Sequence, residues 1–172
     1  MIKLKKSLTT SGILVTALVL ALLLYVASKV LANGKKNPQA NLDPLQIQEI
    51  ILSELQQSGY VYPYSQYWVY VSKMETAGWT SDLFKTRLNL WGMRTPQTRF
   101  TTATNKGSRD IWANYESVRS AAKDIVLYMD ALNYPKRVGS LQELIQIMKE
   151  KGYYGDEDFG SYYTKVVSWI NK

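Results

Sequence analysis

Glu75 is the residue whose type and position are best suited to chemistry. The 172-residue chain has no histidine and no cysteine, which excludes Ser-His-Asp relays, thiol nucleophiles and the usual nitrogen or sulfur ligands of zinc. Any reaction must therefore use carboxylates, hydroxyls, amides, lysine or arginine. Glu75 ends a predicted helix and shares a mostly apolar face of it with Trp68 and Val71. Because an apolar pocket raises the pKa of a carboxyl group, Glu75 is a candidate general acid.

Four short motifs occur at and after Glu75 in a defined order. They are METAGW (74–79), NLWGMR (89–94), WANYES (112–117) and GYYGD (152–156). In this order they resemble the glucosaminidase family of bacterial peptidoglycan hydrolases, which includes flagellar and autolysin-type endo-β-N-acetylglucosaminidases of lysozyme-like fold. The corresponding elements of that family are E-S-G-W-G, N-L-F-G-I-K, F-R-x-Y-x-S and G-Y-A-x-D. This chain has one extra residue, Ala77, between the glutamate and the Gly-Trp pair of the first element. The resemblance covers about residues 65–172 and implies that Glu75 is the catalytic acid.

The resemblance also implies a second acidic group on a hairpin lobe, where it would activate water or stabilise developing charge. Asp110 is the best-placed candidate. Glu116 matches the aspartate of the family's Y-D-S run, but the following Ser117 predicts the start of a helix there. If no second acid operates, the substrate's own 2-acetamido group would be the nucleophile, or the protein would be a lytic transglycosylase that uses Glu75 alone.

Three aromatic residues are candidates for substrate binding. Tyr115 matches the family's tyrosine near the cleaved bond, where its phenol would hydrogen-bond the sugar or orient the attacking group. Trp91 and Tyr153 would present ring faces to sugar C–H groups, and Trp91 is expected to be partly structural, since aromatic residues at such positions more often pack in the core. Asn89 is expected to fix the turn around Gly92, which permits close approach of the backbone to the catalytic helix or the substrate.

The elements that must position these residues are predicted to be mostly helical. Helices are expected over residues 44–59 and 65–77, from Ser117 onward, from Ser140 onward, and after Asp156 as far as residue 170. The threonine-rich segment 98–115 contains the turn-like NKGS and predicts a small hairpin that pairs 99–104 with 110–115. The expected fold class is therefore mostly α: a lysozyme-like helical domain with one small β-hairpin.

The first 36 residues differ in character from the rest. Residues 7–28 carry no charge and are long enough, as a helix, to cross a hydrocarbon core of about 30 Å. Six of the 21 basic residues flank this run, leaving 15 basic against 14 acidic residues beyond position 36. The excess positive charge therefore indicates membrane flanks, not a nucleic-acid surface. A cleaved signal peptide is the alternative, with Val30 and Ala32 at cleavage-site spacing before Asn33.

These observations predict a transmembrane anchor at 1–32, a linker at 33–42 and a catalytic domain at 43–172. The predicted function is cleavage of peptidoglycan glycan strands at N-acetylglucosaminyl bonds, with no metal, no organic cofactor and no nucleic-acid partner. The protein would sit in the lipid bilayer of a bacterial envelope, facing the cell wall, or in the membrane of a lipid-containing phage virion. The alternatives are a lytic transglycosylase and a catalytically inactive glycan-binding or structural protein of an envelope or virion.

Overall fold

The computed structural model describes residues 38–172. The predicted membrane anchor and the first half of the predicted linker, residues 33–37, lie outside the described residues. Among residues 38–172, no helix is long and apolar enough to span a bilayer. The described part of the chain is mostly helical, as the sequence predicts.

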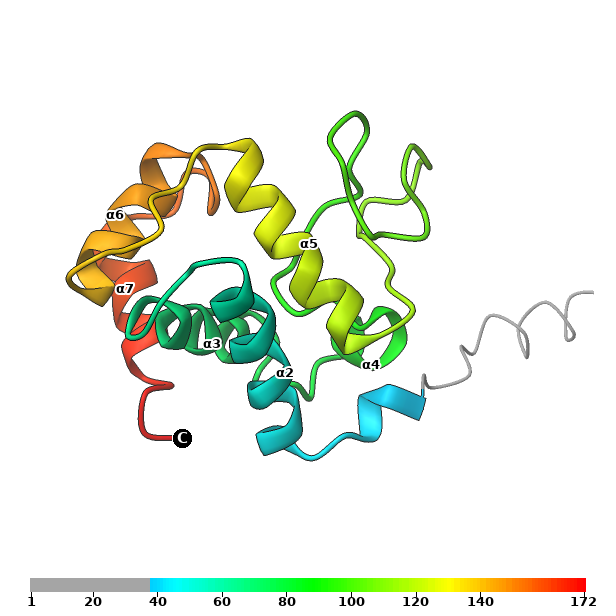
Figure 1. Cartoon of the computed structure of the whole chain (residues 1–172), viewed down its shortest axis with the longest axis horizontal. Coiled ribbons are helices and arrows are strands. Elements are labelled where there is room, and N and C mark those ends of the chain that lie inside the picture. The colour runs from blue at the N-terminus through cyan, green and yellow to red at the C-terminus, as the bar shows by residue number, and fades with distance from the viewer. Residues whose placement is uncertain (1–37) are drawn as a thin grey trace, which may run out of the picture. The chain divides into compact units, whose positions relative to one another are not determined.

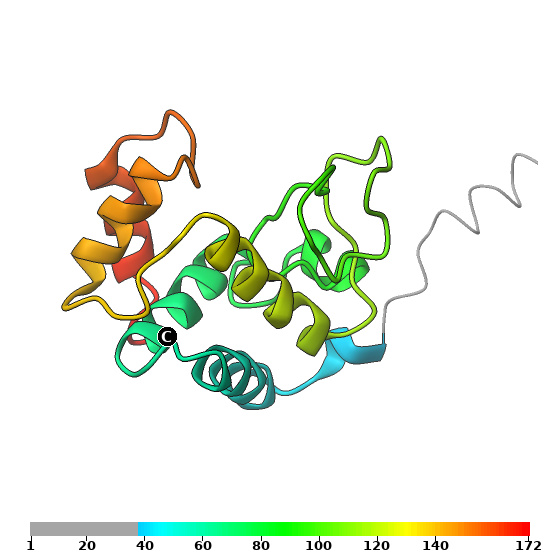
Figure 2. The same ribbon diagram turned by 45° about the horizontal axis from the view of Figure 1, so that its top comes forward.

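A short 3-10 helix, η1 (Pro38–Asn41), precedes the α-helices. They are α2 (Pro44–Gln57), α3 (Tyr64–Glu75), α4 (Asp82–Arg87), α5 (Val118–Ala131), α6 (Leu141–Glu150) and α7 (Phe159–Val167). Helix α3 contacts α2, α6 and α7, while α2 also packs against α5. Figures 1 and 2 show α6 and α7 on one side of this domain and the α4–α5 loop (residues 88–117) on the other, with α3 and α5 between them.

Among residues 38–172, every α-helix except α3 begins where a side chain accepts from a free backbone N–H group. Asp43 and Gln46 form a capping box at the start of α2, with Pro44 in the first turn. Ser117 and Ser140 cap α5 and α6, which confirms both predicted starts. Asp158 caps α7, so this helix is shorter at both ends than predicted.

The chain reverses direction directly after Glu75. Ala77, Gly78 and Trp79 all have left-handed backbone conformations, with φ of 50°, 68° and 64°. A Cβ at Gly78 would lie 2.9 Å from the ring of Trp169, so glycine is required there on both counts. The reversal brings the Trp79 indole back onto α3, where its N–H donates to the Ser72 hydroxyl at 2.9 Å. The extra residue of this motif is thus accommodated in a left-handed turn beyond the carboxyl end of α3.

The predicted hairpin is wrong, since residues 38–172 contain no β-strand and only one isolated antiparallel bridge, between Arg94 and Trp112. The Thr104 N–H does donate to the Asn114 carbonyl at 2.8 Å, but Thr102 bonds to α5 instead. Its hydroxyl donates to the Ser120 carbonyl at 2.6 Å. Side-chain hydrogen bonds of this kind compete with a backbone ladder, which explains why 99–104 does not become a strand.

Asp124 of α5 is the buried group that binds the α4–α5 loop to the helices. Its carboxylate accepts two bonds from the Arg99 guanidinium, at 2.9 and 2.7 Å, and one from the Thr101 hydroxyl at 2.5 Å. The Thr102 N–H and the Tyr115 phenol complete the set at 3.2 and 2.8 Å. Burial alone would raise the pKa of Asp124, but these donors outweigh it and lower that pKa.

Candidate active site

A cavity of about 740 Å³ opens beside the carboxyl end of α3. Its walls come from four parts of the chain: the end of α3, the α4–α5 loop, Tyr128 of α5, and the α6–α7 loop continuing into α7. This volume is typical of a ligand-binding cleft. Glu75 lies in its wall, so the structure places the predicted catalytic acid in a cavity large enough for a ligand.

Within residues 38–172, the Glu75 side chain is held by one hydrogen bond. Its Oε1 accepts from the Tyr162 phenol of α7 at 2.7 Å. Burial is the largest influence on the Glu75 pKa and raises it; the Tyr162 bond lowers it, the charge of Glu157 raises it, and Lys165 lowers it. The net pKa is raised, so the carboxyl group keeps its proton to higher pH than an exposed glutamate. This is the property that a general acid needs.

Gly92 lies against the other carboxylate oxygen. It has a φ of +60°, and a Cβ built on it would be 3.4 Å from Glu75 Oε2. Any side chain here would therefore strain the backbone, and its Cβ would touch the carboxyl group. The close approach expected of this glycine is confirmed.

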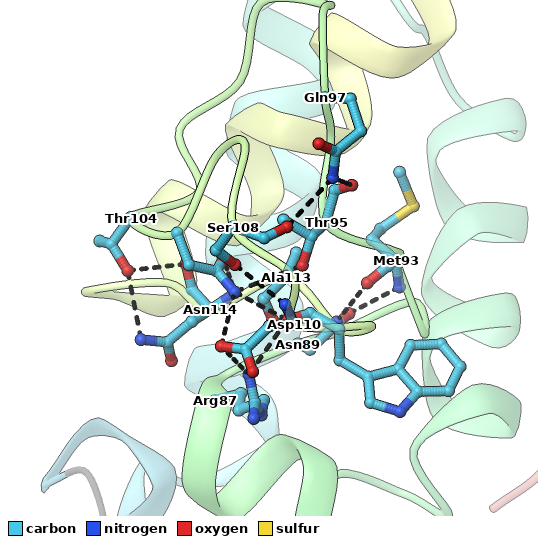
Figure 3. Close-up of polar contacts among 12 residues, drawn as sticks. Arg87, Asn89, Met93, Thr95, Gln97, Thr104, Ser108, Asp110, Ala113 and Asn114 are labelled. Carbon is cyan, nitrogen blue, oxygen red and sulfur yellow. Dashed lines mark hydrogen bonds and ion pairs between the residues drawn. The ribbon is translucent and has the colours of Figure 1, made fainter.

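Asn89 fixes the backbone around Gly92. Its side-chain amide donates to the carbonyls of Met93 (2.8 Å) and Ala113 (3.2 Å), and its oxygen accepts from the Met93 N–H at 2.8 Å. Figure 3 shows these contacts joining the two sides of the α4–α5 loop. Asn89 is fully buried, so its role in the turn is structural, as the sequence predicts.

Trp91 is a core side chain. It is 2% exposed, and its indole N–H donates to the Trp68 carbonyl at 3.1 Å. Tyr153 reaches the cavity wall, where its hydroxyl donates to the Trp91 carbonyl at 2.8 Å and its ring meets the Trp68 ring edge to face. Both residues therefore border the cavity, but Trp91 does so from within the packed core.

Tyr115 and Asp110 do not line the cavity with Glu75. The Tyr115 phenol is buried and donates to Asp124, as described above. The Asp110 side chain is 54% exposed and pairs with Arg87 at 3.5 Å, a contact visible in Figure 3. Neither residue therefore shares the cavity wall with Glu75.

The sequence does not predict several of the cavity-lining residues, among them Tyr162, Glu157 and Trp112. Tyr162 is 87 positions from Glu75, and no local pattern links the two. Glu157 directly follows the GYYGD motif, which was the one available signal. Trp112 opens the WANYES motif and is 38% exposed, unlike the buried Trp91.

A second carboxylate with a different environment lies in the same cavity. Glu157 Oε1 accepts from the Lys165 ammonium at 2.5 Å and from the Ser161 hydroxyl at 2.9 Å. The Lys165 bond is the main reason that the pKa of Glu157 is lowered. The site therefore contains one carboxyl group whose pKa is raised and one whose pKa is lowered.

Within residues 38–172, no three Asp or Glu side chains gather in a way that could hold a metal ion. Comparisons with protein-family models, with curated proteins and with solved structures find no match to this chain. The resemblance to the glucosaminidase family therefore depends on the four motifs alone.

Proposed function

We propose that this protein is a peptidoglycan hydrolase that cleaves glycan strands at N-acetylglucosaminyl bonds, with Glu75 as general acid. The observation that carries the proposal is the position of Glu75: a carboxyl group of raised pKa in the wall of a 740 Å³ cavity. The motif resemblance supports the choice of substrate class.

The geometry supports proton donation from one particular oxygen. Tyr162 donates to Oε1, so the acidic proton of Glu75 belongs on Oε2, the oxygen next to Gly92. A glycosidic oxygen in the cavity would take this proton as its bond to the anomeric carbon breaks, because the leaving sugar is otherwise too basic. Gly92 leaves room for that approach.

The cavity offers a surface for a sugar as well as an acid. Trp112 lines it with an exposed indole, and Arg94, its neighbour across the single bridge, lines it with an exposed cation. An indole face suits the C–H surface of a pyranose ring. A cation suits the carboxylates that peptidoglycan carries on its lactyl and peptide groups.

We further propose that residues 1–32 anchor the enzyme in a bilayer next to its polymer, in a bacterial envelope or a lipid-containing virion. The 22 uncharged residues from 7 to 28 and their flanking lysines support an anchor. A tether raises the local concentration of enzyme at the wall.

The test uses the full chain in mild detergent on purified peptidoglycan, with the wild type beside Glu75→Gln. Glu150→Gln is the matched control, because Glu150 is exposed and bonds only to Gln146 among the described residues. The wild type and the control should clear the suspension, and Glu75→Gln should not. A wild type that clears nothing would indicate the inactive glycan-binding alternative.

Mass spectrometry of the products separates the two enzyme classes. Reducing N-acetylglucosamine ends are expected from hydrolysis. Anhydro-muramyl ends would instead identify a lytic transglycosylase, which also requires one acid but no water in the cleavage step.

A further inference from the structure

Glu157 is placed precisely in the cavity wall by the α6–α7 loop. The Lys149 ammonium donates to the carbonyls of Gly155 and Glu157, both at 2.7 Å. Asp158, the next residue, accepts from the Ser161 N–H at 2.9 Å and so starts α7. The backbone on both sides of Glu157 is therefore held by hydrogen bonds, which is what a residue with a precise task needs.

Glu75 and Glu157 are bound in the same way. In each, Oε1 accepts a hydrogen bond from α7: Tyr162 donates to Glu75, and Lys165 with Ser161 to Glu157. Within residues 38–172, Oε2 of neither carboxyl group takes part in a hydrogen bond. Each group is thus oriented through one oxygen and keeps the other for a ligand.

Asp110 is also bound through one oxygen, since Arg87 and Asn105 both donate to its Oδ2, but it differs in position and exposure. It lies outside the cavity wall, its side chain is more than half exposed, and its partners are Arg87 and Asn105 of the α4–α5 loop. The second carboxylate expected on the hairpin lobe therefore has a better candidate on the opposite wall.

We propose that Glu157 is the second carboxylate of the reaction and that its negative charge, facing the substrate, stabilises the sugar cation formed when Glu75 protonates the leaving oxygen. This inference rests on the proposed function. Glu75 and Glu157 respond oppositely to their surroundings, since burial raises the pKa of Glu75 and Lys165 lowers that of Glu157. Two neighbouring carboxyl groups whose surroundings shift their pKa values in opposite directions are typical of a general acid paired with an ionised stabiliser.

The step balances with water alone. The bond between the anomeric carbon and the glycosidic oxygen breaks, its electron pair stays on the oxygen, and that oxygen takes the Glu75 proton. The positive charge left on the sugar ring faces the Glu157 carboxylate. Water then bonds to the anomeric carbon and gives a proton to the Glu75 carboxylate, which restores the acid.

The test compares Glu157→Gln with Lys165→Met on purified peptidoglycan, with the full chain in each case. Glu157→Gln removes the charge, and kcat should fall about 100-fold with little change in KM, as when one electrostatic stabiliser is removed. Lys165→Met breaks the same ion pair but keeps the carboxylate, so kcat should fall less than 10-fold. Glu157→Asp should recover part of the lost rate, and thermal melting of every variant identifies any that fails to fold.

Each result distinguishes this inference from the proposed function. Equal losses of kcat in Glu157→Gln and Lys165→Met would show that the ion pair only holds the loop, and would overturn the catalytic role of Glu157. Full activity of Glu157→Gln together with loss in Asp110→Asn would overturn it in favour of Asp110. A folded wild type without activity would instead refute the proposed function itself.

Discussion

The Tyr162 phenol donates a 2.7 Å hydrogen bond to Glu75 Oε1 and so joins the carboxyl end of α3 to α7. Tyr162 is 2% exposed, and its ring stacks on Tyr154 with centroids 4.0 Å apart. A buried, stacked phenol has little freedom, so it fixes the orientation of the carboxyl group. It also stabilises the ionised form of Glu75 against the effect of burial.

Tyr162→Phe should therefore change the pH dependence of activity. Losing a donor to the ionised form raises the Glu75 pKa further, and an acid catalyst works while it is protonated. The alkaline limb of the kcat profile should thus move to higher pH, while kcat at its maximum falls about 10-fold because the carboxyl group is less well oriented. An unshifted limb would contradict the assignment of that limb to Glu75.

Gly92→Ala should lose activity beyond its effect on stability. The new Cβ would strain a backbone at φ +60° and lie 3.4 Å from Glu75 Oε2. Gly107→Ala is the matched control, since Gly107 has φ +74° with nothing within 4 Å of a Cβ. Both variants should lose about 1 kcal/mol in the free energy of unfolding, measured by denaturant titration, and only Gly92→Ala should lose kcat. Equal activity in the two would show that Gly92 has no role in the cleft.

Trp112→Ala should weaken substrate binding. Trp112 lines the cavity at 38% exposure, whereas its neighbour Ile111 is 65% exposed and does not line it. Loss of an indole platform should raise KM about 10-fold for soluble glycan fragments with less effect on kcat. Ile111→Ala should leave both constants near the wild-type values. If the two variants behave alike, the indole does not contact the sugar.

Asp124→Asn should destabilise the fold in a pH-dependent way. The pKa of Asp124 is lowered in the folded protein, so its stabilisation is fully present above the ordinary pKa of about 3.9 and is lost as pH falls through the folded value. At pH 7 the loss in free energy of unfolding should be about 3–5 kcal/mol, because the Arg99 charge loses its partner. The difference from wild type should shrink below pH 4. A constant difference would show that the bonds to Asp124 do not depend on its charge.

The sequence predicts the helical part of this fold well because its signals are local. Asp43, Ser117 and Ser140 cap the helices that their patterns predict, and Glu75 ends α3 as the periodicity indicates. The prediction of a hairpin is wrong for a physical reason. Thr102 bonds to Ser120 of α5, 18 positions away, and the sequence of 98–115 alone does not reveal that competing bond.

The same distinction between local and long-range signals applies to the candidate site. Glu75 and Gly92 can be found from short motifs, and the structure brings them together. Tyr162 can be found only from the packing of α7 against α3. Tyr115 matches its motif but serves the buried Asp124 network, because a motif specifies residue types and not the direction in which a side chain points.

The most direct test of the account is the rate at which full-length wild type and Glu75→Gln release new sugar ends from purified peptidoglycan. The glutamine keeps the size of the side chain and can still accept from Tyr162, but it has no acidic proton. If Glu75 is the general acid, the melting temperature and glycan binding of Glu75→Gln should stay near wild type while kcat falls at least about 1,000-fold. A folded Glu75→Gln protein that cleaves the wall as fast as wild type would contradict it.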